Sequence, residues 1–265
     1  MSNLLRAHAP LTEEAWSLVD EEARQRLAPA LAGRKLVDFS GPLGWHHSGT
    51  DVGRATPISA PSPGTVARRR VVLPLVELRA PFALSLDELR DAARGALDLD
   101  LAALDEAAQA IAQAENVALF HGWVDAQIRG IAEASPHEPG SLGSDVVEYP
   151  ARVASAVATL LSVGVSGPYG LALGPEAYTG VVEITEQGRP VIDHLREILG
   201  GPVVRAPGVR GAVAVSLRGG DFLFESGQDL SVGYERHDAE IIHLYLEESF
   251  SFRIVSPDAA VALRS

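Results

Sequence analysis

Apolar side chains recur every three or four residues from Trp16 to Leu27. This spacing is typical of an amphipathic helix, which we expect over residues 13–31. Thr12 precedes the pattern and can cap the helix, because its hydroxyl can accept a hydrogen bond from a free amide of the first turn. Pro29 has no amide proton, so we expect it to kink or end the helix near residue 28.

A segment rich in glycine and proline follows this helix. Residues 40–64 contain both residue types at short intervals, which predicts turns and extended chain rather than packed core. Residues 71–84 then form an apolar run typical of a strand. The two stretches together predict a long β-hairpin arm with its tip near residues 61–64.

Three more helices are predicted farther along the chain. The clearest covers residues 100–120, where apolar positions mark one face and Gly122 provides a stop signal. An alanine-rich helix is expected over residues 151–161. A third is expected over residues 191–199, between Pro190 and a glycine pair.

Short β-rich runs replace the helical pattern beyond residue 202. They cover residues 203–204, 211–217, 222–224, 241–246 and 250–255. Gly219 and Gly220 separate two of these runs, which we interpret as a hairpin turn braced by Asp221. Because helices and strands are partly segregated along the chain, the sequence predicts an α+β fold.

Composition narrows the class of protein. The chain has 265 residues, 46% of them hydrophobic, which suggests two connected lobes and more apolar surface than a monomer needs to bury. Subunit contacts are therefore expected. No cysteine is present, which excludes disulfides and thiolate metal sites. We find no signal peptide and no apolar run long enough to span a membrane, so we expect a cytoplasmic protein.

The charge balance argues against nucleic acid as a partner. Lys and Arg number 22 against 35 Asp and Glu, a formal net charge of −13, whereas phosphate backbones are bound by basic surfaces. The one concentrated basic run comprises Arg68, Arg69 and Arg70. We interpret it as an exposed strand edge or an interface charge cluster.

The sequence offers no catalytic, metal or phosphate motif. The expected helices lack the Glu-x-x-His pairs of a di-iron bundle, and neither a Gly-x-Ser-x-Gly nucleophile elbow nor a P-loop is present. His46 and His47 lie in a glycine-rich loop without a regularly spaced third ligand. His121, at the end of the longest helix, is interpreted as a partner of the helix dipole or a cap for its carbonyls.

Several short strings of the chain occur together in a characteristic order. They include Gly-Arg-Lys-Leu-Val-Asp at residues 33–38 and Gly-Pro-Leu-Gly-Trp at residues 41–45. The others lie at residues 9–12, 74–79, 120–122, 128–131, 167–169, 218–222, 227–234 and 248–252. Together they resemble family 1, linocin-M18-like encapsulin shell proteins, and the resemblance covers essentially the whole chain.

This resemblance implies the HK97 phage-capsid fold and an icosahedral shell rather than an enzyme. The implied division is an N-terminal helix and start of the P-domain at 1–47, an E-loop at 48–80, the P-domain with its long helix at 81–134, an A-domain at 135–218 and the last P-domain strands at 219–265. The implied partners are other copies of the chain, in an icosahedral homo-oligomer of at least ~60 subunits, and a cargo enzyme such as a ferritin-like protein or a dye-decolorising peroxidase. No nucleic acid and no membrane are expected as partners.

The resemblance also implies two functional surfaces and argues against a flavin. A groove for the C-terminal targeting peptide of the cargo would bury a few aliphatic anchors, with Arg34 and Asp38 setting the register. Its lining would comprise Leu5, Ala9, Leu11, Arg34, Asp38, Leu230, Tyr234 and Ile254. A five-fold pore loop would comprise Glu186, Gln187, Gly188, Arg189 and Pro190. Asp87 stands where some relatives carry a flavin-stacking tryptophan, so we expect no cofactor.

Two alternatives to the encapsulin interpretation remain open. A phage-type major capsid protein would have the same fold, although no long scaffolding region precedes the first helix here. A soluble hydrolase or bacteriocin is the second, since a catalytic triad can arise without a local motif.

Overall fold

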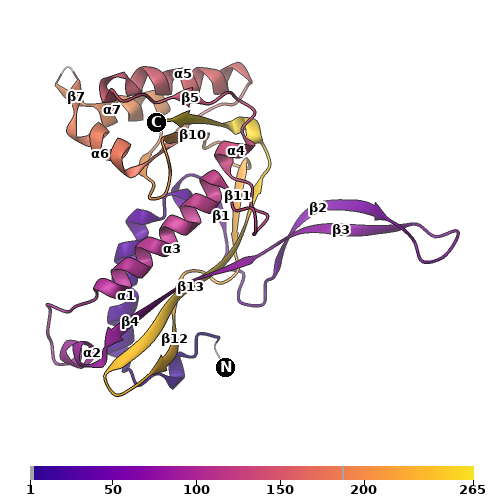
Figure 1. Ribbon diagram of the computed structural model, residues 1–265. Helices are drawn as coiled ribbons and strands as arrows, with labels where there is room; N and C mark the ends of the chain where they lie inside the picture. The colour runs from indigo at the N-terminus through magenta and orange to yellow at the C-terminus, as the bar shows by residue number, and fades with distance from the viewer. Residues whose placement is uncertain (1–2, 187) are drawn as a thin grey trace.

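The computed structural model of the protein describes residues 3–186 and 188–265, which form an elongated body with one protruding arm (Figure 1). The α-helices are α1 (Glu13–Ala30), α2 (Leu86–Ala93), α3 (Ala102–His121), α4 (Ile131–Ala134), α5 (Tyr149–Ser162), α6 (Pro175–Glu183) and α7 (Val191–Leu199). The strands are β1 (Asp38–Ser40), β2 (Gly49–Ile58), β3 (Ala67–Pro74), β4 (Val76–Ser85), β5 (Gly140–Ser141), β6 (Tyr169–Leu173), β7 (Thr185–Glu186), β8 (Arg189–Pro190), β9 (Val203–Arg205), β10 (Ala212–Ser216), β11 (Phe222–Ser226), β12 (Ser231–His237), β13 (Ile241–Ile254) and β14 (Ala260–Arg264).

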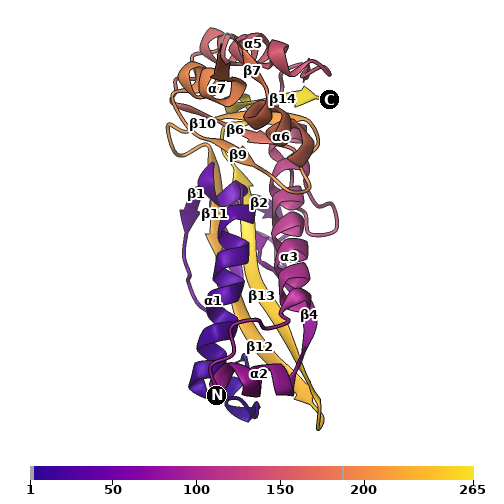
Figure 2. The same ribbon diagram turned by 90° about the vertical axis from the view of Figure 1, so that its left-hand side faces the viewer.

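The first lobe combines α1 and α3 with a sheet of five strands. Its order is β1-β11-β13-β12, and β4 pairs with β13 as well. Figure 2 shows α1 and α3 running along this sheet. Val19 and Leu27 of α1, Leu104 and Ile111 of α3 and Leu244 of β13 are buried in one cluster, so the predicted amphipathic faces of both helices meet the sheet.

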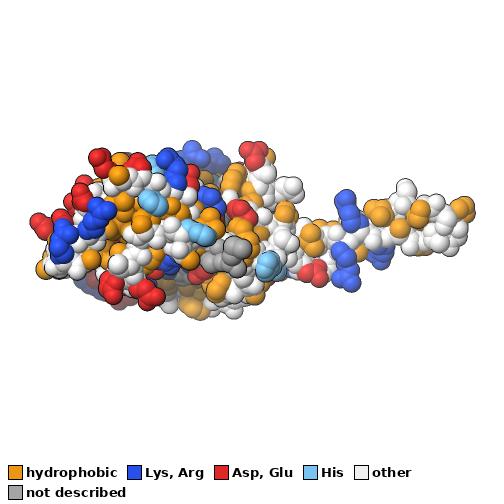
Figure 3. Space-filling view, turned by 90° about the horizontal axis from the view of Figure 1, so that it is seen from below, with side chains coloured by type: hydrophobic (Ala, Val, Ile, Leu, Met, Phe, Trp, Pro, Cys, Tyr) orange, Lys and Arg blue, Asp and Glu red, His pale blue; other side chains and the backbone are white. Residues whose placement is uncertain are grey.

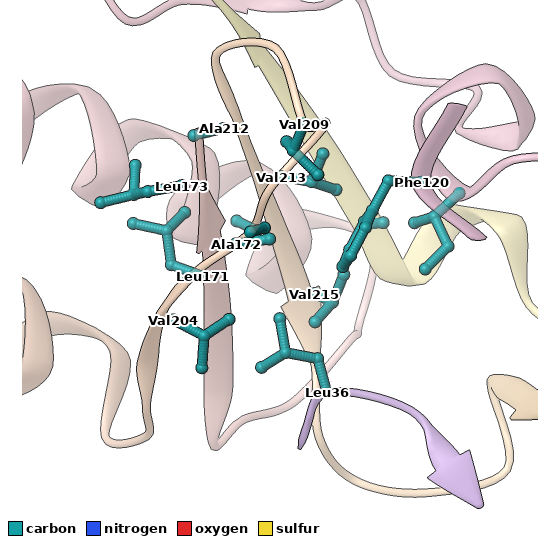
Figure 4. Packing of buried hydrophobic residues seen from close by; sticks show 14 of the residues in the cluster. Leu36, Phe120, Leu171, Ala172, Leu173, Val204, Val209, Ala212, Val213 and Val215 are labelled. Atoms are coloured by element: carbon teal, nitrogen blue, oxygen red, sulfur yellow. The ribbon is translucent and has the colours of Figure 1, made fainter. Parts of the chain in front are cut away.

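The second lobe is built on the sheet β5-β14-β10-β6-β9, which carries α5, α6 and α7. Every residue of β6 and β10 is buried. Figure 4 shows Leu171 and Val213 of these strands in the packed interior, with Phe120 of α3 and Leu36 beside them. The core of this lobe therefore continues into the end of the long helix.

The predicted hairpin arm is confirmed. Strands β2 and β3 form a two-stranded antiparallel ribbon in which Gly49 pairs with Pro74 and Ile58 with Ala67. The ribbon projects away from the body (Figure 1). At its base, the Nε2 atom of His47 lies 2.7 Å from a carboxylate oxygen of Glu225 on β11, which ties the arm to the first lobe.

Pro29 does not end the first helix where the sequence predicted. Helix α1 continues to Ala30, and the amide of Leu31 still donates to the carbonyl of Leu27. A proline in the last turn removes only one helical hydrogen bond, so the helix can close around it. The side chain of Lys35 then donates to the carbonyl of Pro29 at 3.1 Å.

The hairpin predicted at Gly219 and Gly220 is wrong. Strands β10 and β11 on either side belong to different sheets, so this segment crosses from the second lobe to the first. Both glycines have positive φ, 85° and 82°, which favours glycine. Asp221 does brace the crossing, because it accepts hydrogen bonds from Arg218 at 2.9 Å.

The end of the chain differs from the implied domain division. Residues 219–265 were expected to complete the lobe of the long helix, but β14 pairs with β10 and β5 of the second sheet. The chain therefore crosses back between β13 and β14, and its last strand belongs to the second lobe.

His121 does not serve as a cation at the end of α3. Its Nε2 atom accepts a hydrogen bond from the amide of Arg210 at 3.1 Å, which only a neutral ring can do on that nitrogen. Burial, and then the charge of Arg210, lower the pKa of the ring. Within the described residues, no helix is long and apolar enough to cross a membrane.

Candidate functional site

The connection between α1 and β1 carries an arginine surrounded by carboxylates. Arg34 donates from Nε to Glu115 at 2.7 Å, from one terminal nitrogen to Asp229 at 2.6 Å, and from the other to Glu248 at 2.7 Å. These acids come from α3, from the loop before β12, and from β13. All three nitrogens of the guanidinium are therefore engaged within the chain.

Two of these carboxylates are fully buried. Glu115 and Glu248 are 0% and 1% exposed, and the second oxygen of each has no hydrogen-bond partner among the described residues. Burial raises the pKa of both carboxyl groups, and the charge of Glu115 raises that of Glu248 further. Burial lowers the pKa of Arg34, but the three carboxylates outweigh it and the net shift is upward.

Two aromatic rings lie over the same guanidinium. Its carbon is 5.2 Å from the ring centroids of both Phe39 and Phe224, a distance at which a cation is attracted to an aromatic face. The two rings also stack, with centroids 5.5 Å apart. We name Arg34, Glu115, Asp229 and Glu248 with these rings the Arg34 cluster.

Asn116 fixes the position of this cluster. Its side-chain oxygen accepts hydrogen bonds from the amides of Ala32 and Gly33, at 3.0 and 3.1 Å, and its nitrogen donates to the carbonyl of Ala30 at 2.9 Å. A Cβ atom at Gly33 would lie 2.5 Å from the side chain of Leu119. A glycine here lets the chain after α1 approach α3 closely.

A groove of about 450 Å³ lies between α1 and β12, and Arg34 and Asp229 of the Arg34 cluster are part of its lining. Its lining includes the buried leucines Leu27 and Leu246, and Arg34 with Leu230. Arg6 also lines it and is held by an ion pair of 2.7 Å with Asp20. The groove thus has an apolar floor and charged walls.

The structure divides the predicted groove residues into separate places. Arg34 and Leu230 line the groove directly. Leu5 precedes Arg6 and is 42% exposed, whereas Ala9 and Leu11 pack against the hydrophobic core of the first lobe. Tyr234 is buried on β12, and its hydroxyl lies 2.6 Å from Nδ1 of His237.

Asp38 and Ile254 lie outside this groove. A carboxylate oxygen of Asp38 accepts a hydrogen bond from the amide of Gly220 at 2.6 Å, and the residue lines a different pocket beside Ser216. Ile254 of β13 pairs with Phe222 of β11 and packs against the hydrophobic core that includes the second lobe. Both serve the crossing between the two lobes.

The predicted pore loop is a short hairpin formed by β7 and β8. Gly188 has a positive φ of 82°, and Gln187 lies outside the described residues. Arg189 pairs with Glu197 of α7 at 3.1 Å, and Glu186 lies 3.2 Å from Nδ1 of His194 on the same helix. The charges of the loop are therefore partly neutralised by α7.

The chain matches a family model described as "Encapsulating protein for peroxidase" over residues 1–251. It is also 46% identical to the type 1 encapsulin shell protein of Rhodospirillum rubrum, over 100% of this chain and 97% of that protein. The chain belongs to the encapsulin shell protein family. The corresponding protein of Mycobacterium tuberculosis is 38% identical over 99% of both chains.

Solved structures confirm the HK97-type capsid fold of this encapsulin shell chain. A virus-like particle from Pyrococcus furiosus matches with a TM-score of 0.64 and 17% identity, covering 95% of this chain and 98% of that one. The capsid of an empty GTA particle matches with a TM-score of 0.51 and 16% identity, over 100% and 94%. Because the family consists of structural shell proteins, the encapsulin chain is not an enzyme.

Sequence reasoning missed the acids of the Arg34 cluster. The sequence showed no Glu-x-x-His motif on the helix that holds Glu115, and Asp229 and Glu248 stood out only as parts of the strings that resemble encapsulins. The sequence nevertheless contained a signal for the two fully buried acids. Glu115 interrupts the apolar face of a helix and Glu248 interrupts an apolar strand, and a buried acid without a metal needs a cationic partner.

Proposed function

We propose that this encapsulin shell chain assembles into a closed icosahedral compartment of at least ~60 copies that encloses a cargo enzyme. The observation that supports this most is the arm. A two-stranded ribbon is at best marginally stable alone in water, yet β2 and β3 leave the body and expose Val66 at the tip, 92% exposed, and Val72. A second copy of the chain can cover these surfaces.

Reconstruction of the purified particle by electron microscopy tests this proposal. We expect a hollow shell in which each arm lies against a neighbouring subunit. Particles without closed symmetry, or arms that extend freely into solvent, would contradict it.

We further propose that the cargo is a peroxidase of the dye-decolorising type or a ferritin-like protein. The matching family is described as an encapsulating protein for peroxidase, which supports the first. The cargo would be captured through a C-terminal peptide in the groove between α1 and β12. Leu27, Leu230 and Leu246 offer an apolar floor for aliphatic anchors, each of which contributes roughly 1.5–3 kcal/mol when fully buried.

The register role predicted for Arg34 and Asp38 is not part of this proposal. Arg34 already donates to three carboxylates and Asp38 already accepts from Gly220. Arg6 and Arg24 also line the groove, and each has a single acidic ion-pair partner, Asp20 and Glu21 respectively, whereas Arg34 has three. Co-expression of the shell with a reporter protein that carries the last residues of a candidate cargo tests capture, and an unloaded shell would contradict it.

We also propose that the β7–β8 hairpin lines a five-fold pore for small solutes or ions. A ring of like charges selects solutes by sign, and each subunit would contribute Glu186 and Arg189 together with their partners His194 and Glu197. The selectivity then depends on four side chains per subunit. Solute flux into loaded shells measures it.

A further inference from the structure

The arm is strongly basic in an otherwise acidic chain. Residues 48–74 contain four arginines and a single acid, Asp51, for a net charge of +3. The chain as a whole carries −13, so the remaining residues carry −16. Figure 3 shows basic side chains along the arm and acidic ones across the body.

Strand register places two arginines on each face of the ribbon. Arg69 pairs with Thr56, and Arg54 pairs with Val71. Because cross-strand partners share a face and successive residues alternate, Arg54 and Arg69 project from the same face as Ile58. Arg68 and Arg70 project from the other face.

The positive charge on the face of Arg54 and Arg69 is not balanced by any acid among the described residues. Arg70 on the other face lies 3.9 Å from Asp51, but within residues 3–186 and 188–265 neither Arg54 nor Arg69 has an ion-pair partner. Both side chains are exposed, and Ile58, which lies beyond Arg69 toward the tip on the same face, is 49% exposed. This face therefore suits a surface that is acidic and partly apolar.

A segment of that character is formed by α2 and the loop after it. Residues 86–100 contain five acids and two arginines, a net charge of −3. Arg90 and Arg94 already pair with Asp87 and Asp91, and Asp98 has no ion-pair partner among the described residues. Leu97 next to it is 97% exposed.

The two charged surfaces lie on different sides of the body. In Figure 1 the arm leaves on the right, whereas α2 lies at the lower left. A contact between unlike surfaces on different sides joins subunits head to tail, and such contacts close into rings when the rotation allows. Each copy would then both donate an arm and receive one.

We propose that the Arg54/Arg69 face of the arm docks on the acidic segment 86–100 of a neighbouring copy. This inference rests on the proposed shell, for which it names the contacting surfaces and makes their charge a determinant of assembly. Opposite charges on the two surfaces speed encounter and make its rate depend on salt. The exposed Ile58 and Leu97 become buried in the contact.

Charge reversal on one surface and then on both tests the proposal. R54E/R69E and D87R/D98R each place like charges in the contact, and we expect each to slow assembly from dissociated subunits at least about tenfold. The combination of all four substitutions restores opposite charges and should recover most of the rate. R54K/R69K keeps the sign and should assemble normally. Light scattering follows the rate, and far-UV circular dichroism of the subunits checks the fold.

The outcomes separate this proposal from the shell itself. It is overturned if R54E/R69E assembles at the unmodified rate, if the combined variant stays as slow as the single reversals, or if the unmodified rate is the same in low and high salt. Shells that still form would leave the shell proposal standing. Loss of co-purified nucleic acid in R54E/R69E with unchanged assembly would assign the arginines to a polyanion and overturn the proposal. An unmodified chain that never assembles contradicts the proposed shell instead.

Discussion

Replacement of Arg34 by methionine isolates the role of the Arg34 cluster. The variant R34M keeps an apolar stem of similar length but removes the guanidinium that Glu115, Asp229 and Glu248 share. Asp229 is partly exposed and can be solvated by water, whereas Glu115 and Glu248 are buried. Two carboxylates would remain in the interior without a cation.

The expected cost follows from this burial. Removal of one partner of a buried ion pair costs about 3–5 kcal/mol, and proteins are stable by only about 5–15 kcal/mol. Glu248 can lower the cost by holding a proton, because its pKa is already raised by burial and by Glu115. We therefore expect R34M to lose about 3–5 kcal/mol rather than twice that amount.

Denaturant unfolding of dissociated subunits measures this loss, with tryptophan fluorescence as the signal. The double variant R34M/E248Q is the matched control, because it removes one buried charge together with its partner. It should be more stable than R34M alone, with a coupling of about 1–3 kcal/mol. A change below about 0.5 kcal/mol in R34M, within the range of ordinary surface substitutions, together with lost cargo loading, would refute the structural role and assign Arg34 to peptide recognition.

Three further predictions concern the same surfaces. Burial raises the folded-state pKa of Glu248 above 4.5, so the folded chain holds a proton that the unfolded chain releases, and this residue lowers the free energy of unfolding as the pH rises above 4.5. E248Q should therefore be more stable than the unmodified chain at pH 8 and equal to it at pH 4, and a stability difference that does not change with pH would refute this. L5D should give intact but empty shells, because Leu5 is exposed and its replacement leaves the core unchanged, whereas L11D also perturbs the core against which Leu11 packs. V124D is the control at another exposed site, and normal cargo loading of L5D would contradict the proposed peptide groove. R189E places like charges beside Glu197 and makes the pore ring more acidic, so the uptake of anions relative to cations should fall, and identical flux would remove the pore assignment.

Local signals in the sequence predicted the elements whose boundaries are chemically marked. Helix α7 has the predicted bounds 191–199 because a proline precedes it and a glycine with positive φ follows it. The arm was predicted for the same reason, since its turn residues separate two strand-like stretches. Helix α2 was missed, although Ser85 caps it by accepting a hydrogen bond from the amide of Asp87.

Long-range pairing could not be predicted from these signals. β10 and β11 are neighbours along the chain but lie in different sheets, and only tertiary packing decides this. The Arg34 cluster has the same origin, because Arg34 contacts Glu115, Asp229 and Glu248 across separations of 81, 195 and 214 residues. The resemblance to encapsulins pointed to the region, but it did not reveal that the guanidinium is already occupied.

The mass of the native particle tests the central claim most directly. Light scattering or mass measurement on the purified chain should give at least about 1.7 MDa, the mass of ~60 copies of a 28.0 kDa subunit in a closed icosahedral shell. A stable monomer or small oligomer at the same protein concentration would contradict the assignment of this chain as a self-assembling shell.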